Sequence, residues 1–199
     1  KRQYPNIKIE IVEENSMDLE EKLLIGALEI AILCLPLKNA NVSYQVFYED
    51  PIYVALPSGH PLNDRAYQKE GSGEKYLDLE KLRGEEFILT RHVKKTRMAA
   101  DRILANLGND YEVMMESANI ETVIRLVASG LGISLIPSIF ARTYKTGDKI
   151  KYYRIEERYH PVWQWAVIYA DSIENLTRPS KELYRILCEK GCQLPNYIE

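Results

Sequence analysis

Seven consecutive residues at positions 90–96, Thr-Arg-His-Val-Lys-Lys-Thr, carry the groups best suited to binding a small anion. Arg91, His92, Lys94 and Lys95 put positive charge before a predicted helix of about residues 97–107, where the helix dipole favours negative charge. A bound anion would relieve that conflict. The alternative for the two lysines is an ordinary solvated basic loop.

Thr90 and Thr96 bracket this loop. Thr90, like Arg91, lies nearest a predicted hinge, which favours contact with a ligand. For Thr96, the alternative to ligand contact is a role as a helix cap alone.

Two other predicted helices begin at polar residues. Asn15 or Ser16 can cap a helix that runs to about Ile25, and Asn119 precedes an apolar helical run that begins at Ile120. Hydroxyl, amide and N–H groups at a helix start can also meet an anion. Capping alone and ligand contact therefore both stay open for Ser16 and Asn119.

The sequence offers little for catalysis or for a metal. It has no Gly-x-Ser-x-Gly, Walker, HExxH or GxGxxG motif, so we expect no enzyme, cofactor or metal. His92 has no carboxylate or histidine at ligand spacing along the chain. Cys188 and Cys192 are four residues apart, which fits half of a metal or redox site or, with nothing else nearby, two small packing residues.

Composition excludes several classes of protein. The net charge is −3 and the Lys and Arg residues are dispersed, so the chain has no electrostatic footprint for nucleic acid. No apolar run approaches the roughly 20 residues of a membrane span, and the first ten residues lack the apolar core of a signal peptide. We therefore expect a cytoplasmic protein without membrane contact.

The first half of the chain predicts a strand at Ile7–Glu13, a helix, and a buried parallel strand at Glu29–Leu35 that Pro36 ends. Two more strands, Val42–Asp50 and Ile52–Pro57, are expected on either side of Pro51. This strand, helix, strand order is typical of an α/β domain.

The second half repeats this order. Strands are expected at 86–90, 111–116, 133–136, 150–155 and 162–170. Helices are expected at about 97–107, from a polar start at 117–120 until Gly130 breaks the run, and at 177–189, where Leu183, Ile186 and Leu187 face inward. We predict two α/β lobes with separate sheets, residues 1–86 plus 164–199 and residues 87–163. A double crossover would join them as a hinge, and clefts between lobes are common ligand sites.

Five segments in this order and spacing resemble the effector-binding domain of LysR-type transcriptional regulators. They are YPNIKIEI, EENSMDLEEKLLIGALEIAIL, FYEDPIYVALPSGHPL, LDLEKLRGEEFIL and ESANIETVIRLVASGLGISLIPSIFA. Together they cover nearly the whole chain. Each motif is loose, but the set in register is specific.

The resemblance implies a two-lobed fold like that of the type II periplasmic binding proteins, which is Rossmann-like, and assembly as homodimers or homotetramers. It implies a bacterial transcription factor that binds DNA through an N-terminal helix-turn-helix absent from this chain. The family's first strand and helix before YPN are absent too, so we expect an N-terminally truncated domain.

The resemblance also places a small-molecule effector between the lobes. By position it implies contacts from Ser16, Met17 and Pro36 in lobe I, and from Thr90, Arg91, His92, Thr96, Asn119 and Ile120 in lobe II. Trp163, at the return crossover, would pack on the ligand or in the core or hinge. Pro36 would line the cleft besides ending its strand.

We therefore expect a ligand-sensing domain that binds a small anionic metabolite and so modulates DNA binding and transcription. The alternative is a solute-binding protein of a transporter, which shares the order of elements.

Overall fold

The computed structural model describes residues 4–108 and 110–191, and packing divides the chain into two compact units. Of the described residues, the first unit holds 4–49 and 164–191, and the second unit holds 50–108 and 110–163. This division differs from the predicted lobes in residues 50–86, which pack in the second unit. Strand pairing explains the difference, because Tyr53–Pro57 pairs with Ile150–Arg154.

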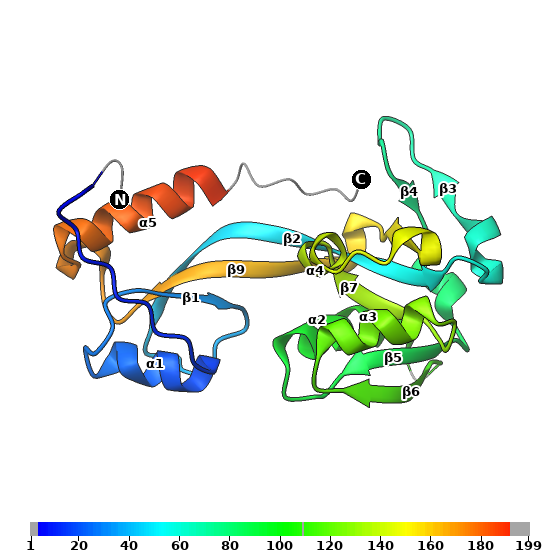
Figure 1. Ribbon diagram of the computed structural model, residues 1–199, viewed down its shortest axis with the longest axis horizontal. Coiled ribbons are helices and arrows are strands. Elements are labelled where there is room, and N and C mark those ends of the chain that lie inside the picture. Colours follow the sequence, from blue (N-terminus) through cyan, green and yellow to red (C-terminus); the bar gives the residue numbers. More distant parts are fainter. Residues whose placement is uncertain (1–3, 109, 192–199) are drawn as a thin grey trace. The chain divides into compact units, whose positions relative to one another are not determined.

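The elements are labelled in Figure 1. The helices are α1 (Ser16–Leu24), α2 (Lys95–Leu104), α3 (Ile120–Ala128), α4 (Ser138–Thr143) and α5 (Arg178–Gly191). The strands are β1 (Ala31–Cys34), β2 (Ser43–Pro57), β3 (Tyr67–Gln68), β4 (Lys75–Tyr76), β5 (Glu86–Thr90), β6 (Glu112–Ser117), β7 (Ser134–Pro137), β8 (Ile150–Arg154) and β9 (Val162–Tyr169).

In the first unit, β1 pairs antiparallel with β9, from Ala31 opposite Ile168 to Cys34 opposite Trp165. This pairing confirms that the strand predicted at 162–170 returns to the sheet of the first unit. Helix α1 buries Leu23 against this sheet in a cluster of apolar side chains. The core of the first unit therefore lies between α1 and the β1–β9 pair.

The prediction of a strand at Ile7–Glu13 was wrong, because this segment is irregular in the structure. Alternating polarity shows which side chains could share a face, but a strand also needs a neighbour that exchanges hydrogen bonds with it. Strand β1 is likewise antiparallel rather than parallel, and Ile32 is 44% exposed. The buried parallel strand expected here was therefore also wrong.

One residue of helix α5 differs from its predicted orientation. Leu183, predicted to face inward, is 44% exposed. Of the two cysteines near the end of this helix, Cys188 is half-buried and Cys192 lies outside the described residues.

Strand β2 runs unbroken through Pro51, where two separate strands were predicted. Proline removes one hydrogen-bond donor, but its backbone angle is compatible with an extended chain. The next residue restores pairing, because Ile52 N donates to Pro161 O at 2.7 Å.

The hydrogen-bonded strand order is β1-β9-β2-β8-β4-β3, with β7 also on β2. The expectation of two separate sheets was therefore wrong. The reason is that β2 and β9 each carry residues of both units.

In the second unit, β5 and β6 form a parallel pair. Helix α3 buries Val123, Ile124 and Val127 in the main apolar cluster of this unit. The turn after α3 approaches β5 closely, because a Cβ added to Gly132 would lie 2.9 Å from Glu86 O. Glycine thus permits the backbone contact that brings β7 beside β5.

A fully buried carboxylate holds the start of α4. Asp50 Oδ1 accepts from Ser138 Oγ at 2.5 Å, and Asp50 Oδ2 accepts from Ile139 N at 3.1 Å. Arg142 lies 3.7 Å from the same carboxylate. Asp50 is thus stabilised by hydrogen bonds and by an opposite charge, as a buried carboxylate requires.

We predict that Asp50→Ala lowers the free energy of unfolding by about 3 kcal/mol. The substitution removes the carboxylate that accepts from the hydroxyl of Ser138 and lies near the guanidinium of Arg142. Chemical denaturation followed by circular dichroism measures this loss. Asp148→Ala, which removes an exposed carboxylate from the same unit, is the matched control and should leave stability within about 0.5 kcal/mol. Equal stability of the two variants would contradict the assignment.

Candidate functional site

The carboxyl ends of β5 and β6 lie side by side. Their parallel register sets Thr90 opposite Ser117, and Arg91 N donates to Ser117 O at 2.9 Å. Each strand leads into a helix, β5 into α2 and β6 into α3. The two polar loops singled out in the sequence are therefore adjacent in space.

The start of α2 is uncapped by any side chain. Its N-cap residue is Lys94, which makes no side-chain cap bond, and its first turn contains no acidic residue. The interpretation of Thr96 as a helix cap is therefore wrong. Thr96 lies inside the helix, and its Oγ1 is 2.8 Å from Thr90 Oγ1. The N–H groups and dipole at this end favour an acceptor with negative charge.

The start of α3 is capped. Asn119 is the N-cap residue, and its Oδ1 accepts from Glu121 N at 2.9 Å. Its own backbone N donates to Ser117 Oγ at 3.2 Å. Capping by Asn119 is thus observed, and its exposed side chain stays a predicted contact, as does Ile120, the first residue of the helix.

A buried arginine that sequence reasoning missed ties the two loops together. Arg97, 4% exposed, donates from Nη1 to Thr90 O at 3.2 Å and to Glu116 Oε1. Its Nε donates to Asp101 Oδ1 at 2.7 Å. The four-residue spacing of Arg97 and Asp101 is the one signal in the sequence that could have found part of this network.

These contacts set the charges of the network. Burial opposes the charged form of Arg97, but hydrogen bonds from its guanidinium to Asp101 and Glu116 outweigh burial and raise its pKa. The hydrogen bond from Arg97 in turn lowers the pKa of Glu116. Arg97 and Glu116 are therefore both ionised at neutral pH.

His92 lies beside this network rather than apart from carboxylates. Its Nε2 is 3.3 Å from Glu116 Oε1 and 3.2 Å from Arg97 Nη2, and its Nδ1 is 3.8 Å from Asp101 Oδ2. No carboxylate lies at ligand spacing from His92 along the chain, but folding brings Glu116 close to it. Within residues 4–108 and 110–191, no group of three or more His, Cys, Asp or Glu side chains could hold a metal ion.

The loop between β5 and α2 presents its side chains to solvent. Arg91, His92 and Lys94 are exposed, and Val93 is 86% exposed. Cationic groups thus surround the uncapped start of α2, with one apolar side chain among them.

The predicted contacts of the first unit lie around α1 and after β1. Asn15 is the N-cap residue, and its Oδ1 accepts from Met17 N and Asp18 N at 3.1 Å each. The interpretation of Ser16 as the cap is therefore wrong, because Ser16 is the first residue of the helix. The thioether of Met17, 52% exposed, lies 3.2 Å from Lys38 Nζ.

Pro36 is exposed and lies two residues after Cys34, the last residue of β1. This position is consistent with the prediction that Pro36 ends the strand.

Trp163 is a core residue. It is 6% exposed, and its ring centroid lies 5.3 Å from that of Phe140. Of the two alternatives from the sequence, core packing is the one that the structure describes.

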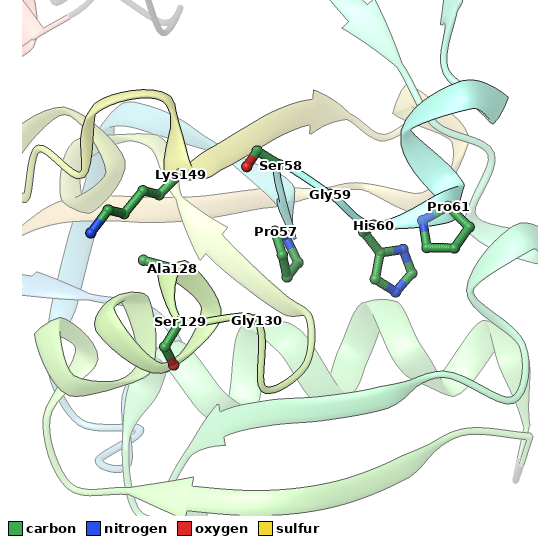
Figure 2. Close-up of a pocket in the computed structure, with 9 residues that line it drawn as sticks. All are labelled: Pro57, Ser58, Gly59, His60, Pro61, Ala128, Ser129, Gly130 and Lys149. Carbon is green, nitrogen blue, oxygen red and sulfur yellow. The ribbon is translucent and has the colours of Figure 1, made fainter.

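A separate depression of about 500 Å³ lies elsewhere in the second unit. Figure 2 shows its lining, which comes from the turn after β2, the end of α3 and Lys149: Pro57, Ser58, Gly59, His60, Pro61, Ala128, Ser129, Gly130 and Lys149. His60 is held there by its backbone turn and by Glu85, 3.4 Å away. The predicted contact residues do not line it.

Solved structures identify the class of fold. The regulatory domain of Synechocystis PCC6803 CcmR in complex with 2-PG matches 98% of this chain and 88% of that chain, with a TM-score of 0.74 and 20% identity. The BenM effector binding domain with its effector benzoate matches 100% and 87%, with a TM-score of 0.75 and 19% identity. The fold is therefore the two-lobed, periplasmic-binding-protein-like α/β fold of LysR effector-binding domains.

The model of the LysR substrate binding domain matches residues 1–177. The chain belongs to this family.

Curated relatives are transcriptional regulators. HTH-type transcriptional regulator AlsR of Bacillus subtilis is 27% identical over 76% of this chain and 50% of its own length. The Hca operon transcriptional activator HcaR of Escherichia coli is 27% identical over 73% and 47%. The chain thus spans about half the length of these relatives, and they give the transporter alternative and the enzyme alternative no support.

Among the described residues, no helix is long and apolar enough to cross a membrane.

We predict that Arg97→Met lowers the free energy of unfolding by about 2–4 kcal/mol, because it leaves Glu116 and Asp101 without their main partner. Arg91→Met is the matched control, since Arg91 is exposed, and should change stability by about 0.5 kcal/mol or less. Urea denaturation at pH 7 measures both. A loss as large in Arg91→Met as in Arg97→Met would contradict the buried network.

The Glu116 carboxylate should also make stability depend on pH. Its pKa is lower in the folded protein than its usual value of about 4.5, so its contribution is present above pH 4.5 and is lost as pH falls through the folded pKa. The difference in unfolding free energy between wild type and Glu116→Gln should therefore shrink between pH 5 and 3, as measured by denaturation at each pH. A constant difference for Glu116→Gln would refute the assignment.

Proposed function

We propose that this chain is the effector-sensing part of a bacterial LysR-type transcription regulator and that it binds a small carboxylate or similar anion at the joined loops after β5 and β6. The observation that carries the proposal is the register of Thr90 with Ser117, together with the 2.9 Å hydrogen bond from Arg91 N to Ser117 O. It makes one polar surface of two loops that are 27 residues apart in the chain.

Charge supports an anionic ligand. The start of α2 has no side-chain cap and no acid in its first turn, and Arg91 and Lys94 are exposed beside it. A carboxylate there would accept hydrogen bonds from helix N–H groups and from a guanidinium, which are short and strong when one partner is ionised. Arg97 offsets one of the two negative charges of Glu116 and Asp101, and the two cations Arg91 and Lys94 outnumber the one that is left.

Each residue of the surface has a proposed role. Arg91 pairs with the carboxylate, and the hydroxyls of Thr90 and Thr96 and the amide of Asn119 orient it, while His92 and Ile120 border it. In the first unit, Ser16, Met17 and Pro36 stay predicted contacts. Trp163 is proposed to support the site from the core rather than to touch the ligand, because it is buried against Phe140.

Relatives support the ligand class. CcmR was solved with 2-PG, BenM with benzoate, and QuiR, at 16% identity, with shikimate. Benzoate and shikimate are both small carboxylates. We propose that this chain takes a ligand of that class and that binding alters DNA recognition in the cytoplasm through a helix-turn-helix domain outside these 199 residues.

A biased conformational equilibrium supplies the mechanism. An effector can change the output of a regulator only if it binds one arrangement of the protein more tightly than another. A difference of about 1.4 kcal/mol in binding would shift the ratio of the two arrangements about tenfold.

A thermal-shift screen of benzoate, shikimate, 2-PG and further small carboxylates tests the proposal. A ligand present at about 100 times its Kd should stabilise the chain by roughly 2.7 kcal/mol, or about 5–10 °C in Tm. Arg91→Ala should raise the Kd of a hit about 10- to 100-fold by removing a charged hydrogen bond. Thr96→Val should raise it by a smaller factor.

Lys149→Ala is the control, because Lys149 lines the depression in Figure 2 and lies outside the proposed site. Its Kd should equal that of wild type. Unchanged affinity in Arg91→Ala and Thr96→Val, with a loss in Lys149→Ala, would move the ligand to that depression and overturn the proposal.

A further inference from the structure

Three cationic side chains line a small depression at the end of α3 in the second unit. The depression has a volume of about 320 Å³, and two hydroxyl groups and a methyl group complete its lining: Arg125, Ala128, Ser129, Lys145, Thr146 and Lys149. None of these six side chains is acidic, and none belongs to the residues proposed to bind the effector. The depression is therefore suited to an anion that the effector site does not explain.

Positive charge remains in the depression after nearby acids are counted. Within residues 4–108 and 110–191, Lys145 and Lys149 form no ion pair. Arg125 donates to Glu121 Oε1 from Nη2 at 2.6 Å and from Nε at 2.9 Å. Asp148 is exposed and lies outside the lining. Two carboxylates thus stand near three cations, and only one of the two is paired with a cation of the lining.

The end of α3 opposes an anion less than a bare helix end would. Ser129 N donates to Arg125 O at 3.1 Å and to Leu126 O at 3.2 Å, and Gly130 N donates to Val127 O at 2.9 Å. The hydroxyl of Ser129 also donates to Leu126 O at 2.7 Å. Because these last carbonyl groups already have donors, their partial negative charge is reduced toward the depression.

The larger depression in Figure 2 continues this surface. It shares Ala128, Ser129 and Lys149 with the smaller one, and Figure 2 shows the Lys149 side chain extending on the side of Ala128. Pro57 and Pro61 belong to its further lining. A ligand that spans both depressions would set its charged group among the cations and its neutral part beside the prolines.

The turn that forms the shared wall is fixed by hydrogen bonds. Ser58 N donates to Lys149 O at 2.9 Å. Asn63 Nδ2 donates to Pro57 O and to Ser58 O at 2.9 Å each, and Tyr153 OH donates to Asn63 Oδ1 at 2.9 Å. A wall that is already ordered loses little conformational freedom when a ligand binds.

We propose that the depression at the end of α3 binds the phosphate group of a small phosphate monoester, and that the depression in Figure 2 takes the neutral part of the same ligand. A phosphate monoester carries nearly two negative charges at neutral pH and three acceptor oxygens. It can therefore accept from Arg125, Lys145 and Lys149 together, whereas a carboxylate offers one charge and two oxygens. Volumes of about 320 and 500 Å³ suit a small ligand. This second ligand site is independent of the proposed effector site.

Calorimetric titration of glycerol 3-phosphate into the full 199-residue chain, at pH 7 and constant low ionic strength, tests the proposal. Wild type should bind with a Kd of about 1 mM or lower. Lys145→Gln and Lys149→Gln should each raise the Kd about tenfold, because each removes a charge-assisted hydrogen bond. Arg125→Gln should raise it by a smaller factor, because Glu121 already occupies part of the guanidinium.

Lys151→Gln is the matched control, because Lys151 is an exposed cation of β8 that lines neither depression. It should bind glycerol 3-phosphate like wild type, and so should Arg91→Ala. Lys149→Gln should in turn leave the Kd of benzoate, or of another carboxylate hit, unchanged. These variants separate a failure of the phosphate site from a failure of the effector site, and an unchanged Tm in each shows that folding is intact.

Four results would overturn the proposal. Loss of binding in Arg91→Ala, with none in Lys145→Gln and Lys149→Gln, would place the phosphate at the effector loops. A loss in Lys151→Gln as large as in Lys149→Gln would reduce the effect to general surface charge. Inorganic phosphate that binds as tightly as glycerol 3-phosphate would remove the role of the second depression. A short DNA duplex that displaces glycerol 3-phosphate would make the surface a nucleic-acid contact instead.

Discussion

The buried guanidinium of Arg97 joins three elements of the second unit. It reaches the last carbonyl of β5, a carboxylate near the end of β6 and a carboxylate one turn along α2. A buried arginine is costly unless its donors are satisfied, so these elements must keep their mutual positions. The loops that we propose to bind the effector are the segments that follow those fixed points.

This arrangement separates support from recognition. Arg97 is buried and neutralised by its partners, whereas Arg91 and Lys94 are exposed and belong to the uncapped start of a helix. One arginine thus holds the framework, and the other is available for a ligand. Sites whose side chains are held by a layer of fixed contacts bind with less loss of conformational freedom.

The sequence predicted elements best where the information is local. The helix between Asn119 and Gly130 was found because its apolar spacing and its polar start lie within a few residues of each other, and Asn119 caps it. Errors arose where distant partners decide. Alternation at Ile7–Glu13 could not reveal whether a neighbouring strand is present, and Pro51 looked like a break although β2 passes through it.

The candidate site was partly predictable for the same reason. Two polar loops at the ends of strands could be expected to meet, given parallel pairing. Glu116 and His92 could not be seen as neighbours, because 24 residues separate them and only the pairing of β5 with β6 brings them within 3.3 Å. The sequence left the cap of α1 open between Asn15 and Ser16, and the structure gives Asn15. At α2 the N-cap position is Lys94 rather than Thr96, since several polar residues at this start could fill the role.

The close approach of Gly132 to β5 limits how this domain can diverge. An alanine methyl there would lie 2.9 Å from a carbonyl oxygen and 3.2 Å from the side chain of Ile88. Backbone cannot yield as a flexible side chain does, so repair would require the whole β7 strand to shift. A substitution at Gly132 therefore has to be accommodated by movement of the backbone, whereas an exposed side chain such as Arg91 can be replaced without it.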